Sequence, residues 1–272
     1  MLYLGFPISN PCHRSRQSAA ILRQMDFSSL PPAENVLNKK RNFRDSYHCC
    51  PDKVDSETSR FTLESRISLE ELFDLPGTPV DEGITFDSDR FSIGVNADGS
   101  FIRDDRSVGI IFDGFEFVEQ NDPYAGFSVG LEGQVFRNNA PRNPSSGISV
   151  EISEISFGVL QGVRITGTIQ DRLGVERIIV FNEAEQFLTV ATRLTNLSDD
   201  EIADVVHMEA LDADQGVALG ISNNALNDVV LDGRLILSGV TSEEFPDSLA
   251  IGLGSNDNRA TTAHAPNLNP YD

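Results

Sequence analysis

The sequence predicts an all-β protein, an antiparallel two-sheet sandwich that follows a disordered N-terminal leader. Three observations favour this fold: apolar and polar residues alternate along many short segments after residue 84, turn residues separate these segments, and the composition changes abruptly near residue 60. Alternation with a period of two places the apolar side chains on one face of a strand. The connections are shorter than the crossovers that parallel strands need, so we expect antiparallel pairing.

The composition divides the chain into a leader and a body. All three cysteines and all three lysines precede residue 60. Residues 1–60 carry 9 Lys plus Arg and 6 Asp plus Glu, whereas residues 61–272 carry 12 Arg and 36 Asp plus Glu, a net charge of −24. We expect residues 1–60 to be a disordered leader, or sequence upstream of the true start with Met25 as an alternative initiator. No basic segment precedes the first apolar residues, so no signal peptide is seen.

Residues 61–83 are expected to form a linker that contains a short helix. Ser68 can cap a helix over residues 68–74, because Glu71 follows three residues later and completes a capping box. Residues 76–79 contain two prolines and then end it. Residues 84–272 are expected to form one β-sandwich domain.

The alternation is clearest in the middle of the body. Residues 163–169 have one apolar and one polar face, and residues 148–152 share this pattern. The apolar phase then shifts to Ile155, which indicates a bulge or a bend near Glu154. Residues 175–181 are largely apolar on both faces, which predicts a strand that is covered on both sides.

Asp-Gly pairs mark several of the expected turns. They occur at residues 98–99, 113–114 and 232–233, each between two apolar runs. Asp-Gly readily adopts the positive φ angles that a two-residue hairpin turn needs. The alternative for the pair at residues 113–114 is a bulge inside one long strand. Together these signals predict about eleven strands with short connections.

Two carboxylates in one tight turn form the candidate metal site. Asp212 and Asp214 are two residues apart at the end of an expected strand. Calcium takes six to eight oxygen ligands, and such a turn can supply several of them. The alternative is an acidic turn that is simply solvated.

A histidine and a glutamate form the second candidate site. His207 and Glu209 are two residues apart on one expected strand and therefore share a face. We expect Val206, Met208 and Ala210 to take the core face, so that His207 and Glu209 point outward or into a concave groove. Such a pair can serve as acid and base on a sugar. The alternative is two polar residues on a solvent face.

The composition also excludes several classes of protein. The acidic body opposes binding to nucleic acid or anionic lipid, and no apolar run reaches the ~18 residues of a membrane-spanning helix. The body has no cysteine for a disulfide framework or thiolate metal site. It also lacks a nucleophile elbow, a phosphate loop and a dinucleotide fingerprint. Cations and extracellular glycan or protein surfaces remain as partners; the oligomeric state is not predicted.

Residues 107–129, 174–220 and 251–260 carry a resemblance to a known class. They resemble a β-sandwich module of secreted bacterial proteins of the hemolysin-type calcium-binding (repeat-in-toxin) class. In that class a strand with a Thr-Leu-Thr-Asn-like end leads to a strand that closes in an acidic turn. The counterparts here are residues 192–198 and 212–215. The alternation also resembles the galactose-mutarotase-like supersandwich, although the calcium-binding nonapeptides of the first class are absent.

The resemblance implies a function and a location. We expect a non-catalytic structural or adhesive module of an extracellular or cell-surface bacterial protein, with Ca²⁺ as a candidate stabilising ion and no other cofactor. The alternative is a carbohydrate-active supersandwich domain that uses His207 and Glu209. The sequence leaves open whether residues 84–272 form a complete sandwich or lack strands at the C-terminal end.

Overall fold

The structure is a computed structural model that describes residues 2–5, 67–101, 109–118, 125–139, 143–146, 148–182, 187–213, 226–230, 235–240, 249–255, 257, 259–263 and 269–271. Within these residues it has seventeen strands and one short helix. The strands form three sheets, and neighbouring strands run antiparallel, as in the pairing of β11 with β12. The predicted all-β, antiparallel fold is therefore confirmed. No helix in the described ranges is long and apolar enough to cross a membrane.

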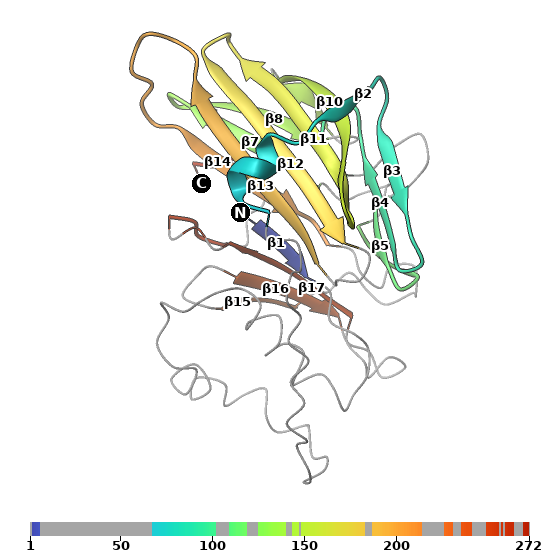
Figure 1. Cartoon of the computed structure of the whole chain (residues 1–272). Coiled ribbons are helices and arrows are strands. Elements are labelled where there is room, and N and C mark those ends of the chain that lie inside the picture. The colour runs from blue at the N-terminus through green and yellow to red at the C-terminus, as the bar shows by residue number, and fades with distance from the viewer. Residues whose placement is uncertain are drawn as a thin grey trace.

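The first layer is one long sheet of nine strands (Figure 1). In order across the sheet these are β15 (Leu226–Val230), β16 (Leu235–Val240), β17 (Leu249–Ser255), β1 (Leu2–Gly5), β13 (Phe187–Asn196), β12 (Leu173–Asn182), β11 (Leu160–Ile169), β10 (Ser149–Phe157) and β2 (Gly77–Val80). Its centre is a meander of long strands from β10 to β13. The sheet thus provides a wide platform for the second layer.

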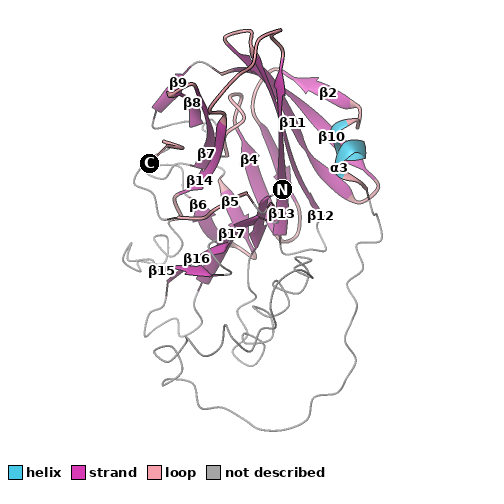
Figure 2. Cartoon of the chain, turned by 90° about the vertical axis from the view of Figure 1, so that its left-hand side faces the viewer, coloured by secondary structure: helices cyan, strands magenta, loops and turns pink. Residues whose placement is uncertain are grey.

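The second layer consists of two four-stranded sheets, which Figure 2 shows beside the long sheet. One has the order β3 (Ile84–Asp87), β4 (Phe91–Val95), β5 (Ile110–Phe112), β6 (Phe115–Val118); the other has the order β14 (Val206–Leu211), β7 (Ala125–Leu131), β8 (Gln134–Asn139), β9 (Asn143–Ser146). Phe101 joins them, because it bridges to Val95 and its N–H donates to the Ala125 carbonyl at 2.9 Å.

The core lies between the two layers. Residues of β4 to β6 pack on the inner face of the long sheet, where they meet Val163, Ile165, Ile179, Phe181, Leu188 and Val190. Residues of β7 pack on the same face farther along, where they meet Ile148, Ile169, Leu173 and Val175. The predicted one-sided alternation of residues 163–169 is thereby confirmed, since Val163, Ile165 and Ile169 are buried.

Helix α3 (Leu69–Phe73) covers part of the outer face of the long sheet. Its predicted capping box is present: the Ser68 N–H donates to Glu71 at 2.7 Å, and the Glu71 N–H donates to the Ser68 hydroxyl at 3.2 Å. Three side chains from this segment, those of residues 72, 73 and 75, pack on Ile155, Ile178, Val180 and Ala191. The prediction that residues 175–181 are covered on both sides is confirmed.

Of the bulge or bend predicted near Glu154, the bulge is wrong. Strands β10 and β11 pair residue by residue from Ser149 to Phe157 with no register shift. Ile155 lies on the outer face because helix α3 offers it an apolar surface there. The apolar phase changes along β10 because the covered face of the sheet changes, while the backbone stays regular.

Two of the three Asp-Gly pairs lie in the described residues, and both form turns. Asp113 and Gly114 have φ angles of 50° and 79° and join β5 to β6 as a two-residue hairpin. Gly99, with φ of 79°, lies in a longer turn closed by its N–H to the Asn96 carbonyl at 2.9 Å. The pair at residues 232–233 lies outside the described residues.

Parts of the expected leader and linker belong to the sheet. Residues 2–5 form β1, which lies between β13 and β17 (Figure 1). Residues 77–80 form edge strand β2, paired with β10. Pro79 is tolerated there because an edge strand need not donate every N–H to the ladder. The rest of the expected leader lies outside the described residues.

Replacing Ile178 by alanine tests the contact between α3 and the outer face. Ile178 is fully buried under this helix, whereas Val159, at the tip of the β10–β11 hairpin, is 62% exposed. We expect Ile178→Ala to lower the free energy of unfolding by about 2–5 kcal/mol, as for a buried aliphatic truncation, and Val159→Ala to change it little. Urea unfolding measures both, and equal losses would contradict the covered outer face.

Candidate functional site

The register of β14 points His207 and Glu209 into the space between the layers. Glu209 lies opposite Phe127 and His207 lies opposite Val129 on β7. Residues directly opposite each other in an antiparallel pair share a face, and both of these β7 residues belong to the core. The expectation that Val206, Met208 and Ala210 take the core face is therefore wrong. From residue 206 to residue 210 the strand is one residue out of phase with its apolar pattern.

The partner that draws Glu209 inward is Arg177 on β12. Alternation along β12 places Arg177 on the inner face with Val175 and Ile179, which belong to the two core clusters. Its side chain is fully buried. Arg177 is not among the residues predicted from the sequence as a candidate site. The signal for it is its position in the alternation, since it falls on the same face of the strand as apolar Val175 and Ile179. A buried arginine requires an anionic partner.

Arg177 and Glu209 form a two-pronged ion pair. The Arg177 Nε donates to Glu209 Oε1 at 2.8 Å, and a terminal nitrogen donates to Oε2 at 2.8 Å. The side chain of Glu209 is only 8% exposed. A planar guanidinium matches both oxygens of a carboxylate, which makes this geometry strong and directional. The pair joins the long sheet to β14 of the second layer.

The remaining surface of the guanidinium is also occupied. Its other terminal nitrogen donates to the Gly99 carbonyl at 2.9 Å. The Arg177 Cζ lies 5.2 Å from the ring centre of Phe101 and 5.0 Å from that of Phe127. Cations are attracted to aromatic faces at such distances. Arg177 therefore connects the long sheet to both parts of the second layer.

Two further side chains contact Glu209. His207 Nε2 lies 3.1 Å from Glu209 Oε1, and the Thr192 hydroxyl donates to the same oxygen at 3.5 Å. Because an ionised carboxylate only accepts, His207 donates this hydrogen bond through Nε2. The Nδ1 atom of His207 is buried and has no hydrogen-bond partner among the described residues. The cluster thus has a complete ion pair at Arg177 and Glu209, whereas the Nδ1 atom of His207 lacks a hydrogen-bond partner among the described residues.

The ionisation of Glu209 follows from these contacts. Burial raises the pKa of its carboxyl, but the charge of Arg177 and the hydrogen bonds from His207 and Arg177 outweigh burial and lower the pKa to about 2. Glu209 is therefore ionised at neutral pH and is a poor general acid. Its two oxygens are already engaged by hydrogen bonds, which also makes it a poor base.

Of the two aspartates in the candidate calcium turn, one lies in the described residues. Asp212 follows directly after β14 and is partly buried, whereas Asp214 lies outside the described residues. Within the described residues no group of three or more His, Cys, Asp or Glu side chains is placed to hold a metal ion. The calcium site therefore stays a prediction.

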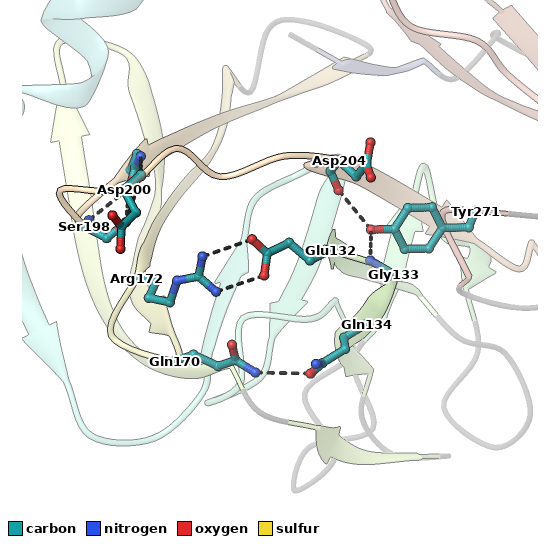
Figure 3. Close-up of polar contacts among 10 residues, drawn as sticks. Glu132, Gly133, Gln134, Gln170, Arg172, Ser198, Asp200, Asp204 and Tyr271 are labelled. Carbon is teal, nitrogen blue, oxygen red and sulfur yellow. Dashed lines mark hydrogen bonds and ion pairs between the residues drawn. The ribbon is translucent and has the colours of Figure 1, made fainter.

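A second polar cluster, at the turn between β7 and β8, also joins the layers (Figure 3). Arg172 donates two hydrogen bonds to Glu132 at 2.9 and 3.0 Å, and Gln170 donates to Gln134 at 3.1 Å. The hydroxyl of Tyr271 accepts from the Gly133 N–H at 3.1 Å and donates to the Asp204 carbonyl at 2.9 Å. These residues are exposed, so their role is to hold chain segments together at the surface rather than to enclose a ligand.

No family model, curated protein or solved structure matches the chain. The resemblance to a hemolysin-type or supersandwich module therefore stays a prediction. The function is therefore inferred from the geometry of the described residues. The geometry shows a buried ion pair that joins two layers, with a histidine at its edge whose side chain is 23% exposed.

A double-mutant cycle tests the buried pair. Glu209→Gln leaves the charge of Arg177 buried without a counter-charge, so we expect it to lower the free energy of unfolding by about 3–5 kcal/mol. Arg177→Met should cost a similar amount. The combined change Arg177→Met/Glu209→Gln should cost less than the sum of the single changes, because neither charge is then left alone. Chemical denaturation provides all the values.

The exposed pair of Arg172 and Glu132 is the matched control. Arg172→Gln and Glu132→Gln remove partners of a similar two-pronged contact at the surface, where solvent screens the charges. Their unfolding midpoints should stay close to the wild type. Additive effects in the Arg177–Glu209 cycle, as small as those of the control, would contradict a buried, coupled pair.

Acid should weaken the wild type through Glu209. A carboxyl whose pKa is lower in the folded state contributes stability above its unfolded pKa, near 4.5, and loses it as the pH falls through about 2. We expect the Glu209→Gln variant to show a shallower loss of stability than the wild type between about pH 4.5 and pH 2. Urea midpoints at a series of pH values measure this difference. Parallel curves would argue that Glu209 titrates normally.

Proposed function

We propose that the chain is a non-catalytic structural or adhesive β-sandwich module of an extracellular protein. The observation that carries the proposal is the engagement of Glu209, the carboxylate that contacts His207, in a buried ion pair with Arg177. A carboxylate that neutralises a buried arginine between the two layers stabilises the fold. Its removal should affect stability first.

The protonation behaviour of the pair supports the same proposal. A general acid or base works best when its pKa lies near the working pH. The pKa of Glu209 is about 2, and its oxygens accept hydrogen bonds from Arg177, His207 and Thr192. The proposed alternative, a carbohydrate-active domain that uses His207 and Glu209, gains no support from this geometry.

Charge and composition support an extracellular setting. The body carries a net charge of −24 and contains neither lysine nor cysteine. Such a surface favours cations and basic partners and disfavours phosphate backbones and anionic lipids. The partners we propose are therefore cations, or an extracellular glycan or protein surface.

A turnover assay with two variants tests the non-catalytic proposal. The full chain, His207→Ala and Glu209→Gln are incubated with a panel of chromogenic glycosides and polysaccharides. We expect no turnover above a heat-inactivated control for any of the three, and a lower melting temperature for Glu209→Gln. Turnover by the wild type that both variants lose, with folding retained, would overturn the proposal in favour of the carbohydrate-active alternative.

Calcium stabilisation is tested by calorimetry on the full chain. If the turn holds an ion, millimolar Ca²⁺ should raise the melting temperature relative to excess EDTA, since a ligand at 100 times its Kd adds about 2.7 kcal/mol to the native state. The variant Asp212→Asn/Asp214→Asn should lose this rise. The variant Asp199→Asn/Asp200→Asn, in a different acidic turn, should keep it. A wild-type melt that is indifferent to calcium would remove the ion from the proposal.

A further inference from the structure

Strand β1 occupies a slot in the middle of the long sheet. Its four residues pair antiparallel with β13 on one side, from Leu2 opposite Val190 to Gly5 opposite Phe187. They pair antiparallel with β17 on the other side, from Leu2 opposite Ser255 to Gly5 opposite Gly252. Both edges of β1 are therefore in the hydrogen-bonded ladder.

Within the described residues, β13 and β17 are linked through β1 and do not pair with each other. Without β1 the nine-stranded sheet divides into one part from β15 to β17 and another from β13 to β2. Each part would then present a row of unpaired N–H and C=O groups. Such an edge is a template for pairing with another strand.

The strands that border the slot belong to the core. Leu188 and Val190 on β13 are 0% and 2% exposed, and Ile251 on β17 is 2% exposed. All three lie in the same hydrophobic cluster. Since unpaired backbone groups next to a buried core are costly, the slot requires an occupant.

The length of chain that follows β1 allows the strand in this slot to come from the same molecule or from a second one. Sixty-one residues, 6–66, separate Gly5 from the next described residue, Ile67. A chain of this length can span at most about 200 Å when fully extended. This length is enough to reach a neighbouring molecule as well as its own body, and the contacts of β1 would be the same in either case.

We infer that β1 is an exchangeable strand, and that a second copy of this chain is a partner that binds through the slot between β13 and β17. Which copy fills the slot is set by the effective concentration of the tethered strand against the concentration of other copies. High local concentration, or refolding from a partly unfolded state, favours exchange. The inference concerns assembly and stands apart from the proposed structural or adhesive role.

Disulfide trapping in full-length chains tests the exchange. The three native cysteines, at positions 12, 49 and 50, are replaced by serine. Tyr3→Cys and Thr189→Cys are then introduced, because these residues are direct partners between β1 and β13. Opposite Cα atoms in an antiparallel pair lie about 4.5–5.5 Å apart, within the range that a disulfide spans.

The first variant carries both new cysteines in one chain and should form an intrachain disulfide. The second sample mixes the two single variants at high concentration, and the mixture is partly unfolded in urea and refolded under oxidising conditions. We expect a disulfide-linked heterodimer on non-reducing gels, with the linked peptide confirmed by mass spectrometry. Thr195→Cys, on the same strand but paired with Gly174 on β12 and away from β1, is the control partner for Tyr3→Cys.

Three results would overturn the inference. An intrachain disulfide without any heterodimer would show that β1 fills the slot but does not exchange. Equal cross-linking of Tyr3→Cys to Thr195→Cys would show random collision. Failure of the double variant to form its intrachain disulfide would remove β1 from the slot altogether. None of these results bears on the turnover assay, so the two proposals fail separately.

Discussion

Arg177 and Glu209 carry opposite charges in the space between two packed layers. A lone ion in that space would be expelled or neutralised, so each side chain is there because of the other. The pair sets the register of β14, since a slip of one residue would turn Glu209 outward and leave Arg177 without its carboxylate. Through the Gly99 carbonyl and the ring of Phe101 the same guanidinium reaches the other small sheet. The arrangement of the second layer therefore depends on this contact.

The same constraint decides what His207 and Glu209 are able to do. Two hydrogen bonds from a buried guanidinium hold the Glu209 carboxylate in place. The same contacts stabilise its charged form and so lower its pKa. His207 donates to Glu209 and is partly buried. The best-supported role of the cluster is to hold β14 onto the sandwich. The proposed structural or adhesive function would then belong to other surfaces of the protein, and β1, in the interior of the long sheet, is the proposed means of assembly.

Elements with a local signal were predictable from the sequence, and elements decided by distant partners were not. Three elements each have a cause within a few residues: the capping box at Ser68, the Asp113-Gly114 turn, and the strand with two apolar faces at residues 175–181. The phase of β14 was misjudged because apolar Met208 suggested a core face, whereas an ion pair with β12 decided it. The placement of β1 had no local signal either, because its partners lie more than 180 residues away.

The ionisation of Glu209 inside the folded protein is the most direct measure of this account. Glu209 labelled with ¹³C at its carboxyl carbon reports protonation by its NMR chemical shift as the pH is lowered. The account predicts a signal that stays at the ionised position through pH 4.5 and moves only as the pH approaches about 2. Titration near 4.5, as for an exposed glutamate, would contradict the buried pair with Arg177 and return Glu209 to the outer face.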